Sequence, residues 1–427
     1  MRLIGKISNY LPYAQITRDT VSISHMKPRS TVNLLLRDSF ITFAKNHILM
    51  KNPILQNIGI LAVVSAIAFG ASAQQTVGLS QNSMSPRIER DSVYFTLNAP
   101  GAKQASVTGD FNGPMNLGPD SIWHAAFPVS KPDLYIYNYQ VDGMTVTDPT
   151  NPYTVRDIAH LFSYFITPGT EYLAKDVPHG SLTREWYHSD KLNMDRRISV
   201  YLPAGYRENP DRRYPALYLL HGMGGDETAW SELGRASYIL DNQIASGKAV
   251  PMIVVMPNGN ARQQATPGET SEGLYATTLE HSVAGKDEFE NSFGEIIDYI
   301  DANYRTLPDA AHRAVAGLSM GGGHTWRLQQ LMPETFDYYG IFSGAVSWPG
   351  NINLMNGDEP SLLPASPLPK LYYIAIGRDD FLYPLNSNFR KSLTSAGIPF
   401  TYEESDGEHT WTNWRSYLTN FLPLLFK

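Results

Sequence analysis

The pentapeptide Gly317-Leu318-Ser319-Met320-Gly321 places a serine between two glycines in the pattern G-x-S-x-G. The apolar run 313–316 before it predicts a strand, and the run 322–331 after it predicts a helix. A tight turn between a strand and a helix exposes the serine hydroxyl and leaves little space for neighbouring side chains. We therefore predict that Ser319 is a nucleophile. The alternative is a glycine-rich turn with a passive serine.

A nucleophilic serine in such a turn needs a histidine base and an acid that orients the base, and both follow the serine along the chain. Only His324 and His409 occur after residue 319. His324 lies on the same predicted helix as the serine and is carried away from it, which favours a packing role. His409 lies in a loop after the strand-like segment 400–404 and is the predicted base.

The predicted acid ends a strand between the serine and the histidine. The buried-strand run 371–376 is followed by Gly377-Arg378-Asp379-Asp380. Adjacent aspartates point in different directions, so only one of them can face His409. These considerations leave Asp379 and Asp380 as alternatives.

Acyl transfer also requires backbone N–H groups that stabilise the oxyanion of the tetrahedral intermediate. The usual donors are the amide after the nucleophile and one amide from a loop after an early strand. Met320 supplies the first. The segment from His221 to Gly225 follows the buried-strand run 216–220, and Met223 in this segment is the predicted second donor. His221 precedes the serine, so we predict that it is a structural residue of this loop.

Residues from about 180 to 427 resemble carbohydrate esterase family 1, the esterase-D-like group of feruloyl and acetyl xylan esterases. The similar segments are RISVYLPAGY (197–206), YPALYLLHGMGGDETAW (214–230), RAVAGLSMGG (313–322), IGRDDFL (376–382) and GEHTWTNW (407–414). The resemblance implies an α/β-hydrolase fold and selects Asp380 as the acid, because the family's acid is the last acidic residue before a phenylalanine. Many relatives carry Gly-Gly where this chain has Gly407-Glu408.

The resemblance implies a secreted serine esterase that needs no cofactor or metal and acts through an acyl-enzyme on ester decorations of plant cell-wall polysaccharide. We expect feruloyl esters on arabinoxylan, because flat cinnamoyl rings stack well on aromatic side chains. The predicted substrate-binding residues are Trp230, Trp348, Phe381 and Trp411. The alternatives are an acetyl xylan esterase, a siderophore-ester hydrolase of the same group, and a catalytically inert carbohydrate-binding protein.

Residues 76–168 differ in pattern from the residues that follow. Short alternating runs separated by Pro, Gly, Asn and Asp predict a small all-β sandwich before the α/β-hydrolase domain. Segments such as FTLNAPGAKQA (95–105) and YIYNYQVDG (135–143) resemble carbohydrate-binding module family 48 and related early-set, immunoglobulin-like sandwiches. We expect a linker over 169–185 and the esterase domain over 186–427. Aromatic side chains of the sandwich could stack on sugars or pack in its core: Trp123, Tyr135, Tyr137 and Tyr139.

The first 73 residues predict export. The apolar run 58–70 ends at Ala71-Ser72-Ala73, which is typical of a signal peptide cleaved after Ala73. A start at Met50 would give this peptide its usual length, so residues 1–49 are predicted to be an upstream extension. The run is short for a membrane span. The sequence does not distinguish the periplasm from the cell exterior.

Net charge and cysteine usage exclude several partners. Residues 1–73 carry eight Lys/Arg and two acids, so their removal changes the formal net charge from −7 to −13. Such an acidic surface disfavours nucleic acid. The chain has no cysteine, which excludes disulfides, a lipoprotein anchor and a cysteine-based metal site.

Overall fold

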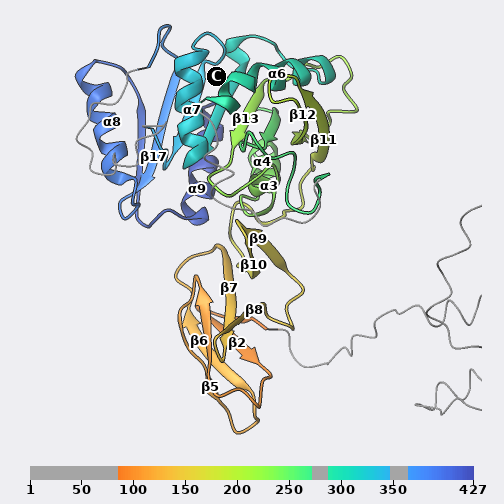
Figure 1. Ribbon diagram of the computed structural model, residues 1–427, viewed down its shortest axis with the longest axis vertical. Coiled ribbons are helices and arrows are strands. Elements are labelled where there is room, and N and C mark those ends of the chain that lie inside the picture. The colour runs from red at the N-terminus through yellow and green to blue at the C-terminus, as the bar shows by residue number, and fades with distance from the viewer. Residues whose placement is uncertain (1–84, 272–286, 347–363) are drawn as a thin grey trace, which may run out of the picture. The chain divides into compact units, whose positions relative to one another are not determined.

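An eight-stranded, mostly parallel sheet forms the centre of the C-terminal part of the chain (Figure 1). The computed structural model describes residues 85–271, 287–346 and 364–427. The predicted signal peptide, the start at Met50, the cleavage site after Ala73 and Trp348 lie outside these residues. The strands, in spatial order, are β11 (Ser181–Ser189), β12 (Met194–Leu202), β14 (Ile253–Pro257), β13 (Ala216–Leu220), β15 (Arg313–Leu318), β16 (Tyr338–Phe342), β17 (Leu371–Gly377) and β18 (Thr401–Ser405).

The first two pairings of this sheet, β11 with β12 and β12 with β14, are antiparallel, and the others are parallel. Parallel strands are buried on both faces and therefore read as continuous apolar runs. All five residues of β13, β14 and β16 are buried.

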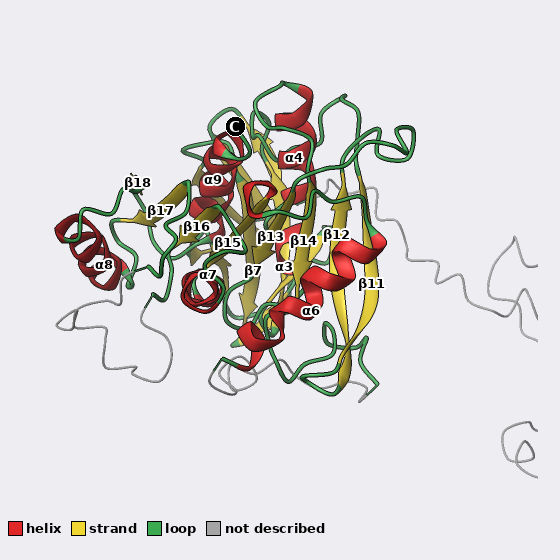
Figure 2. Cartoon of the chain, turned by 90° about the horizontal axis from the view of Figure 1, so that it is seen from above, coloured by secondary structure: helices red, strands yellow, loops and turns green. Residues whose placement is uncertain are grey.

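Helices cover both faces of the sheet. Figure 2 shows α6, α7 and α8 on one side and α4 and α9 on the other. Side chains alternate along each strand, so Tyr218 and Leu220 pack in one core while Leu217 and Leu219 pack in the other. The helices are α3 (Ala229–Glu232), α4 (Ala236–Ala245), α6 (Glu288–Asn303), α7 (Met320–Leu331), α8 (Tyr383–Ser395) and α9 (Trp411–Phe421), with 3-10 turns η1 (Ala310–His312) and η3 (Leu422–Leu424).

The N-terminal part consists of two antiparallel sheets. One has the order β1-β2-β6-β5, and the other has the order β4-β3-β7-β10-β9 with β8 paired to β7. Their strands are β1 (Arg87–Glu89), β2 (Ser92–Leu97), β3 (Ala105–Gly109), β4 (Gly113–Pro114), β5 (Asn116–Leu117), β6 (Trp123–Pro128), β7 (Leu134–Val141), β8 (Met144–Val146), β9 (Thr154–Asp157) and β10 (His160–Ile166). Val93, Phe95 and Val107 from both sheets share one core.

The aromatic residues considered for sugar stacking pack in that core instead. Tyr137 and Tyr139 are fully buried and donate hydrogen bonds from their hydroxyls to Asp148, at 2.8 and 2.9 Å. Trp123 is also buried, and its indole N–H donates to the Ala99 carbonyl at 2.9 Å. Three of the four proposed platform residues are therefore not available to a ligand.

The expected boundary between linker and esterase domain at residue 186 falls inside a strand. β11 starts at Ser181, and its whole length pairs with β12 as the edge of the large sheet. Polar and charged residues predominate in this edge strand without a regular apolar alternation, so the sequence did not indicate it. The two parts of the chain are also not separable by contacts, because the described residues of both belong to one compact unit.

Candidate active site

Ser319 lies in a strained turn between β15 and α7. Its backbone has φ 53° and ψ −115°, in the positive-φ region that non-glycine residues rarely occupy. The turn is held by the Ser319 N–H, which donates to the Phe342 carbonyl at 2.9 Å. A β-carbon on Gly317 would lie 2.4 Å from the Gly321 carbonyl carbon, and one on Gly321 would lie 2.5 Å from the Leu220 carbonyl oxygen. Glycine is needed at both positions because there is no space for a side chain.

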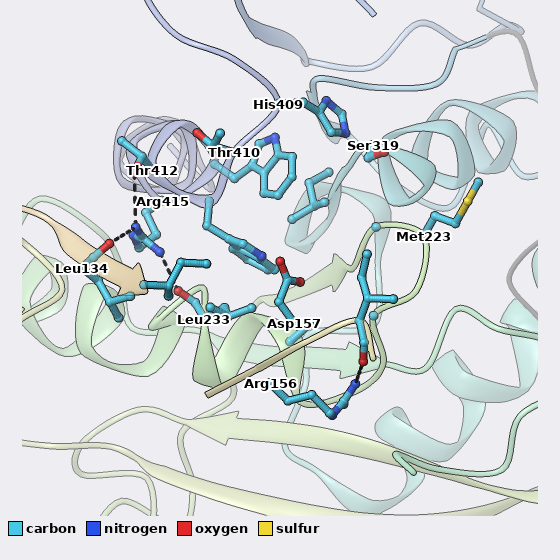
Figure 3. A pocket seen from close by; sticks show the side chains of 18 of the residues that line it. Leu134, Arg156, Asp157, Met223, Leu233, Ser319, His409, Thr410, Thr412 and Arg415 are labelled. Carbon is cyan, nitrogen blue, oxygen red and sulfur yellow. Dashed lines mark hydrogen bonds between the residues drawn. The ribbon is translucent and has the colours of Figure 1, made fainter. Parts of the chain in front are cut away.

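His409 and Asp380 form a hydrogen-bonded pair. The His409 Nδ1–H donates to Asp380 Oδ2 at 2.8 Å, which leaves Nε2 as the nitrogen able to accept a proton. Asp380 is buried, and its other oxygen accepts the Leu382 N–H at 2.8 Å. Asp379 is exposed. Figure 3 shows the His409 imidazole pointing toward Ser319. The structure thus brings Ser319 and His409 to one cavity, with Asp380 bonded to the Nδ1 side of His409.

His221 supports the loop that carries Met223 through two hydrogen bonds to backbone groups. The His221 Nδ1–H donates to the Gly222 carbonyl at 2.7 Å, and Nε2 accepts the Gly259 N–H at 2.7 Å. This pattern fixes the neutral imidazole. Burial lowers the pKa of His221 to about 4, in agreement with that form. His221 therefore supports the loop and has no free nitrogen for proton transfer.

The two predicted oxyanion donors come from different segments, the start of α7 and the loop after β13. Met320 is the first residue of α7, where helical N–H groups have no partner within the helix. Met223 lines the same cavity as Ser319 and His409. Figure 3 places Met223 on the side of Ser319 away from Arg415.

A cavity of about 280 Å³ opens beside Ser319 and His409. Trp411 and Trp414 line it, and Trp414 also contacts the His409 ring, with a centroid distance of 4.9 Å. The cavity is partly apolar and lies near the lower end of the size range of small-molecule sites.

The predicted substrate-binding aromatic residues differ in their positions. Trp411 lines the cavity, whereas Trp230 is 1% exposed, donates its indole N–H to the Leu220 carbonyl at 2.9 Å and does not line the cavity. The prediction for Trp230 is corrected, because this side chain fills the core between α3 and the sheet. Phe381 is exposed and lies against His409, with ring centroids 4.5 Å apart, but it is also outside the cavity.

Arg156 in β9 of the N-terminal part supports the loop that follows Met223. Its guanidinium pairs with Asp226 and donates to the Thr266 hydroxyl at 3.0 Å and to the Ile158 carbonyl at 2.7 Å. The Asp226 side chain is fully buried and accepts the N–H and hydroxyl of Thr228 at 2.9 and 2.7 Å. Burial alone would raise the pKa of Asp226, but Arg156 and Thr228 outweigh it and lower the pKa.

Glu227 is a second buried carboxylate beside this loop. It accepts the Thr266 N–H at 2.9 Å and the Asn258 side-chain amide at 3.1 Å. Burial, with the adjacent charge of Asp226, raises the pKa of Glu227 to about 7. This carboxyl does not line the cavity, so its titration bears on the stability of the loop.

Arg415 in α9 anchors the helix that follows His409. Its guanidinium donates to Asp133 at 2.8 Å and to the carbonyls of Leu134 and Leu233 at 3.1 and 2.9 Å, and the last two contacts are drawn in Figure 3. Both members of the ion pair are buried, with 2% and 1% of their side chains exposed. Asp133 and Leu134 belong to the N-terminal part, which therefore holds α9 as well as the Met223 loop.

Sequence reasoning missed Arg156, Asp157, Glu227 and Arg415. No motif marks them, since each acts through a partner more than 30 residues away or by its position in the cavity. Within the three described ranges, no group of three or more His, Asp or Glu side chains is placed to hold a metal ion. In the same residues, no helix is long and apolar enough to cross a membrane.

Residues 189–364 match a protein-family model described as "Putative esterase". The matched segment contains Ser319 and the Met223 loop but ends before Asp380 and His409. Among curated proteins, an endo-1,4-beta-xylanase/feruloyl esterase of Xylanibacter ruminicola is 30% identical to this chain over 347 residues. The match covers 78% of this chain and 44% of the relative, so this chain spans less than half of that relative's length.

Solved structures share the fold. A ferulic acid esterase from Anaeromyces mucronatus has a TM-score of 0.50 and 24% identity, and the match covers 61% of this chain and 96% of that structure. The enterobactin esterase of Shigella flexneri has a TM-score of 0.61 and 16% identity, and covers 81% of this chain and 97% of its own. At these identities the likeness establishes the α/β-hydrolase fold alone. The second match is longer than the chain after residue 168, so it includes N-terminal strands.

Proposed function

We propose that this protein is a serine carboxylic ester hydrolase in which Ser319, His409 and Asp380 act as nucleophile, general base and orienting acid. Ser319 Oγ attacks the ester carbonyl while His409 Nε2 takes its proton, and the proton is then returned to the departing hydroxyl. The backbone N–H groups of Met223 and Met320 stabilise the oxyanion. Water repeats the cycle on the acyl-enzyme and releases the acid.

The hydrogen bond between His409 Nδ1 and the buried Asp380 carries this proposal. A buried carboxylate that fixes one imidazole tautomer next to a strained serine has little value in a passive turn. The match to an esterase family model supports the same chemistry. This match also argues against the alternative of a catalytically inert carbohydrate-binding protein.

We propose ester-linked hydroxycinnamates of arabinoxylan, such as ferulate, as the substrate. The support is the pair Trp411 and Trp414 in the cavity, against which a cinnamoyl ring can stack, and the similarity to a relative named for xylanase and feruloyl esterase activities. No cofactor or nucleic acid partner is part of the proposal.

Acetyl esters of xylan are the second candidate. The burial of Trp230 and the position of Phe381 outside the cavity reduce the aromatic surface that would favour ferulate. An acetyl group needs none of that surface. A siderophore ester remains a more distant alternative, because the similarity to the enterobactin esterase is one of fold.

The setting of the enzyme is also proposed. We infer export through the signal peptide that ends at Ala73, to the periplasm or beyond the cell. The N-terminal sheets are proposed to be an early-set sandwich similar to carbohydrate-binding module family 48, on the basis of their shared core and the motifs between Phe95 and Asn151.

The test compares kcat/KM on methyl ferulate and on an acetylated xylo-oligosaccharide, with Ser319→Ala as the control. The Ser319→Ala variant is expected to lose about 10⁶-fold in kcat with an unchanged urea unfolding curve. Activity within tenfold of the native enzyme would refute the mechanism. A tenfold preference for the acetyl ester would leave the mechanism intact and replace the substrate.

A further inference from the structure

The turn between β9 and β10 brings the N-terminal part of the chain against the oxyanion loop. Ile158 occupies this turn with φ 52°. A β-carbon on Gly224 would lie 2.8 Å from Cγ2 of Ile158, so the tip of the hairpin touches the backbone next to Met223. Arg156 fixes the hairpin through the buried carboxylate of Asp226. The position of the residue between them, Asp157, is therefore set by two contacts with the esterase part.

Asp157 lines the catalytic cavity together with Ser319 and His409. Figure 3 shows its carboxylate directed from β9 toward the side of the cavity where these two residues lie. Burial raises the pKa of Asp157, while Trp411, Arg156, His160 and the Ile158 N–H act in the opposite direction. The Asp157 carboxylate thus forms part of the cavity wall, next to the indole of Trp411, which also lines the cavity.

The two nearby arginines do not neutralise Asp157 by direct pairing. Arg156 is paired with Asp226, and Arg415 is paired with Asp133. Much of the remaining wall is aliphatic and includes Leu134, Ile136 and Leu318. A carboxylate in such surroundings accepts hydrogen bonds from neutral donors and repels anions. Among the groups of a carbohydrate ester, hydroxyls are the neutral donors.

We propose that Asp157 accepts a hydrogen bond from a hydroxyl group of the bound ester and so makes the N-terminal part a determinant of substrate specificity. This inference rests on the proposed esterase function. The hydroxyl belongs either to the acyl group, as in the phenol of ferulate, or to the sugar that leaves. A site built to bond a hydroxyl discriminates strongly against an analogue that lacks it, because a buried polar group is then left without its partner.

Two substrate pairs separate these sources. Methyl ferulate and methyl 3,4-dimethoxycinnamate differ in the phenolic hydroxyl, and an acetylated xylo-oligosaccharide and 4-nitrophenyl acetate differ in sugar hydroxyls. The variants are Asp157→Leu, which removes the acceptor at similar volume, and Asp157→Asn, which keeps an uncharged acceptor. Asp91→Asn is the control, because Asp91 is an exposed aspartate of the same part outside the cavity.

We expect Asp157→Leu to lower kcat/KM by about 10- to 100-fold on the hydroxyl-bearing member of one pair, as for a charged hydrogen bond, and by less than about threefold on the other member. The kcat/KM of Asp157→Asn should lie between that of the native protein and that of Asp157→Leu. The pair that responds identifies the phenol or the sugar as the donor. Equal losses on all four esters, or no loss on any, would overturn the inference.

Calorimetric titration keeps this inference separate from the proposed function. The Ser319→Ala protein, with and without Asp157→Leu, is titrated with ferulamide, 3,4-dimethoxycinnamamide and xylotriose. The Asp157→Leu substitution should raise the Kd of ferulamide or of xylotriose by at least about tenfold and leave the Kd of 3,4-dimethoxycinnamamide unchanged. A native protein inactive on every ester would refute the proposed function. Binding that does not depend on residue 157 would refute the role of Asp157 even in an active esterase.

Discussion

Replacing Arg156 with methionine removes the cation that faces the buried carboxylate of Asp226 and keeps most of the side-chain volume. Removing one partner of a buried ion pair costs about 3 to 5 kcal/mol, since the other charge is left uncompensated. The Asp226 side chain is fully buried, but Arg156 is 26% exposed and Asp226 keeps its bonds from Thr228. We therefore expect a loss at the lower end, about 3 kcal/mol in the free energy of unfolding.

The loss should depend on pH with a definite sign. In the native protein the pKa of Asp226 is lowered, so its contribution to stability is present above the ordinary value of 3.8 and is lost as pH falls. Without Arg156, burial dominates and the pKa rises, so the folded variant binds a proton that the unfolded chain releases. The difference between variant and native protein should thus be largest near pH 7 and shrink toward pH 4.

Urea unfolding of Arg156→Met, Asp226→Asn and the double variant at pH 7 and pH 4.5 tests this reasoning. The double variant should be more stable than the sum of the single losses predicts, because no buried charge remains. Losses that add to within about 0.5 kcal/mol, or that are equal at both pH values, would refute the account.

Since the Arg156–Asp226 pair supports the Met223 loop, kcat should fall by up to about 10²-fold in Arg156→Met, with a smaller change in KM. Arg156→Lys serves as the charge-conserving control.

Three further outcomes are expected. Asp380→Asn should lower kcat by about 10³ to 10⁴, because the wrong His409 tautomer is then favoured, while Asp379→Asn has a far smaller effect; the reverse ranking would show that the wrong aspartate was assigned. Glu227→Gln should gain stability relative to the native protein as pH rises from about 4.5 to 7, because the raised pKa of Glu227 makes its folded form hold a proton that the unfolded chain has lost, and a pH-independent difference in urea unfolding would contradict this. The mature protein should begin at Gln74 by intact-mass measurement on protein recovered from the envelope or medium, and retention of residues 1–49 would refute both the cleavage site and the start at Met50.

The chain order of Ser319, Asp380 and His409 could be predicted because each ends or follows a strand of one parallel sheet, whose carboxyl ends meet at one edge. Glycine spacing around Ser319 has a steric cause that is visible in the sequence. The choice between Asp379 and Asp380 needed the family resemblance, since neither spacing nor composition says which carboxylate is buried.

The part played by the N-terminal sheets could not be predicted. An alternating pattern indicates strands, but it does not say that Arg156 meets Asp226 or that Asp133 meets Arg415 across 70 and 282 residues. For the same reason Trp230 was expected in the cavity: its position after the Met223 loop is local, whereas its burial depends on Phe342 and Trp411, distant in sequence. The sequence pattern left open whether the sandwich binds sugar, and the contacts join that part to the cavity wall.

The Arg415–Asp133 pair limits how this protein can be cut or recombined. A fragment that starts at residue 169 would lack Asp133 and would leave the Arg415 guanidinium without its counterion, in the helix that carries Trp411 and Trp414. Grafting a different sandwich onto the esterase part would have the same effect unless the new one presented an acid at the position of Asp133. The unit that can be inherited, transplanted or expressed by itself therefore includes the N-terminal sheets together with the esterase part, and gene fusions that respect only the expected boundary at 186 would separate two halves of one buried ion pair.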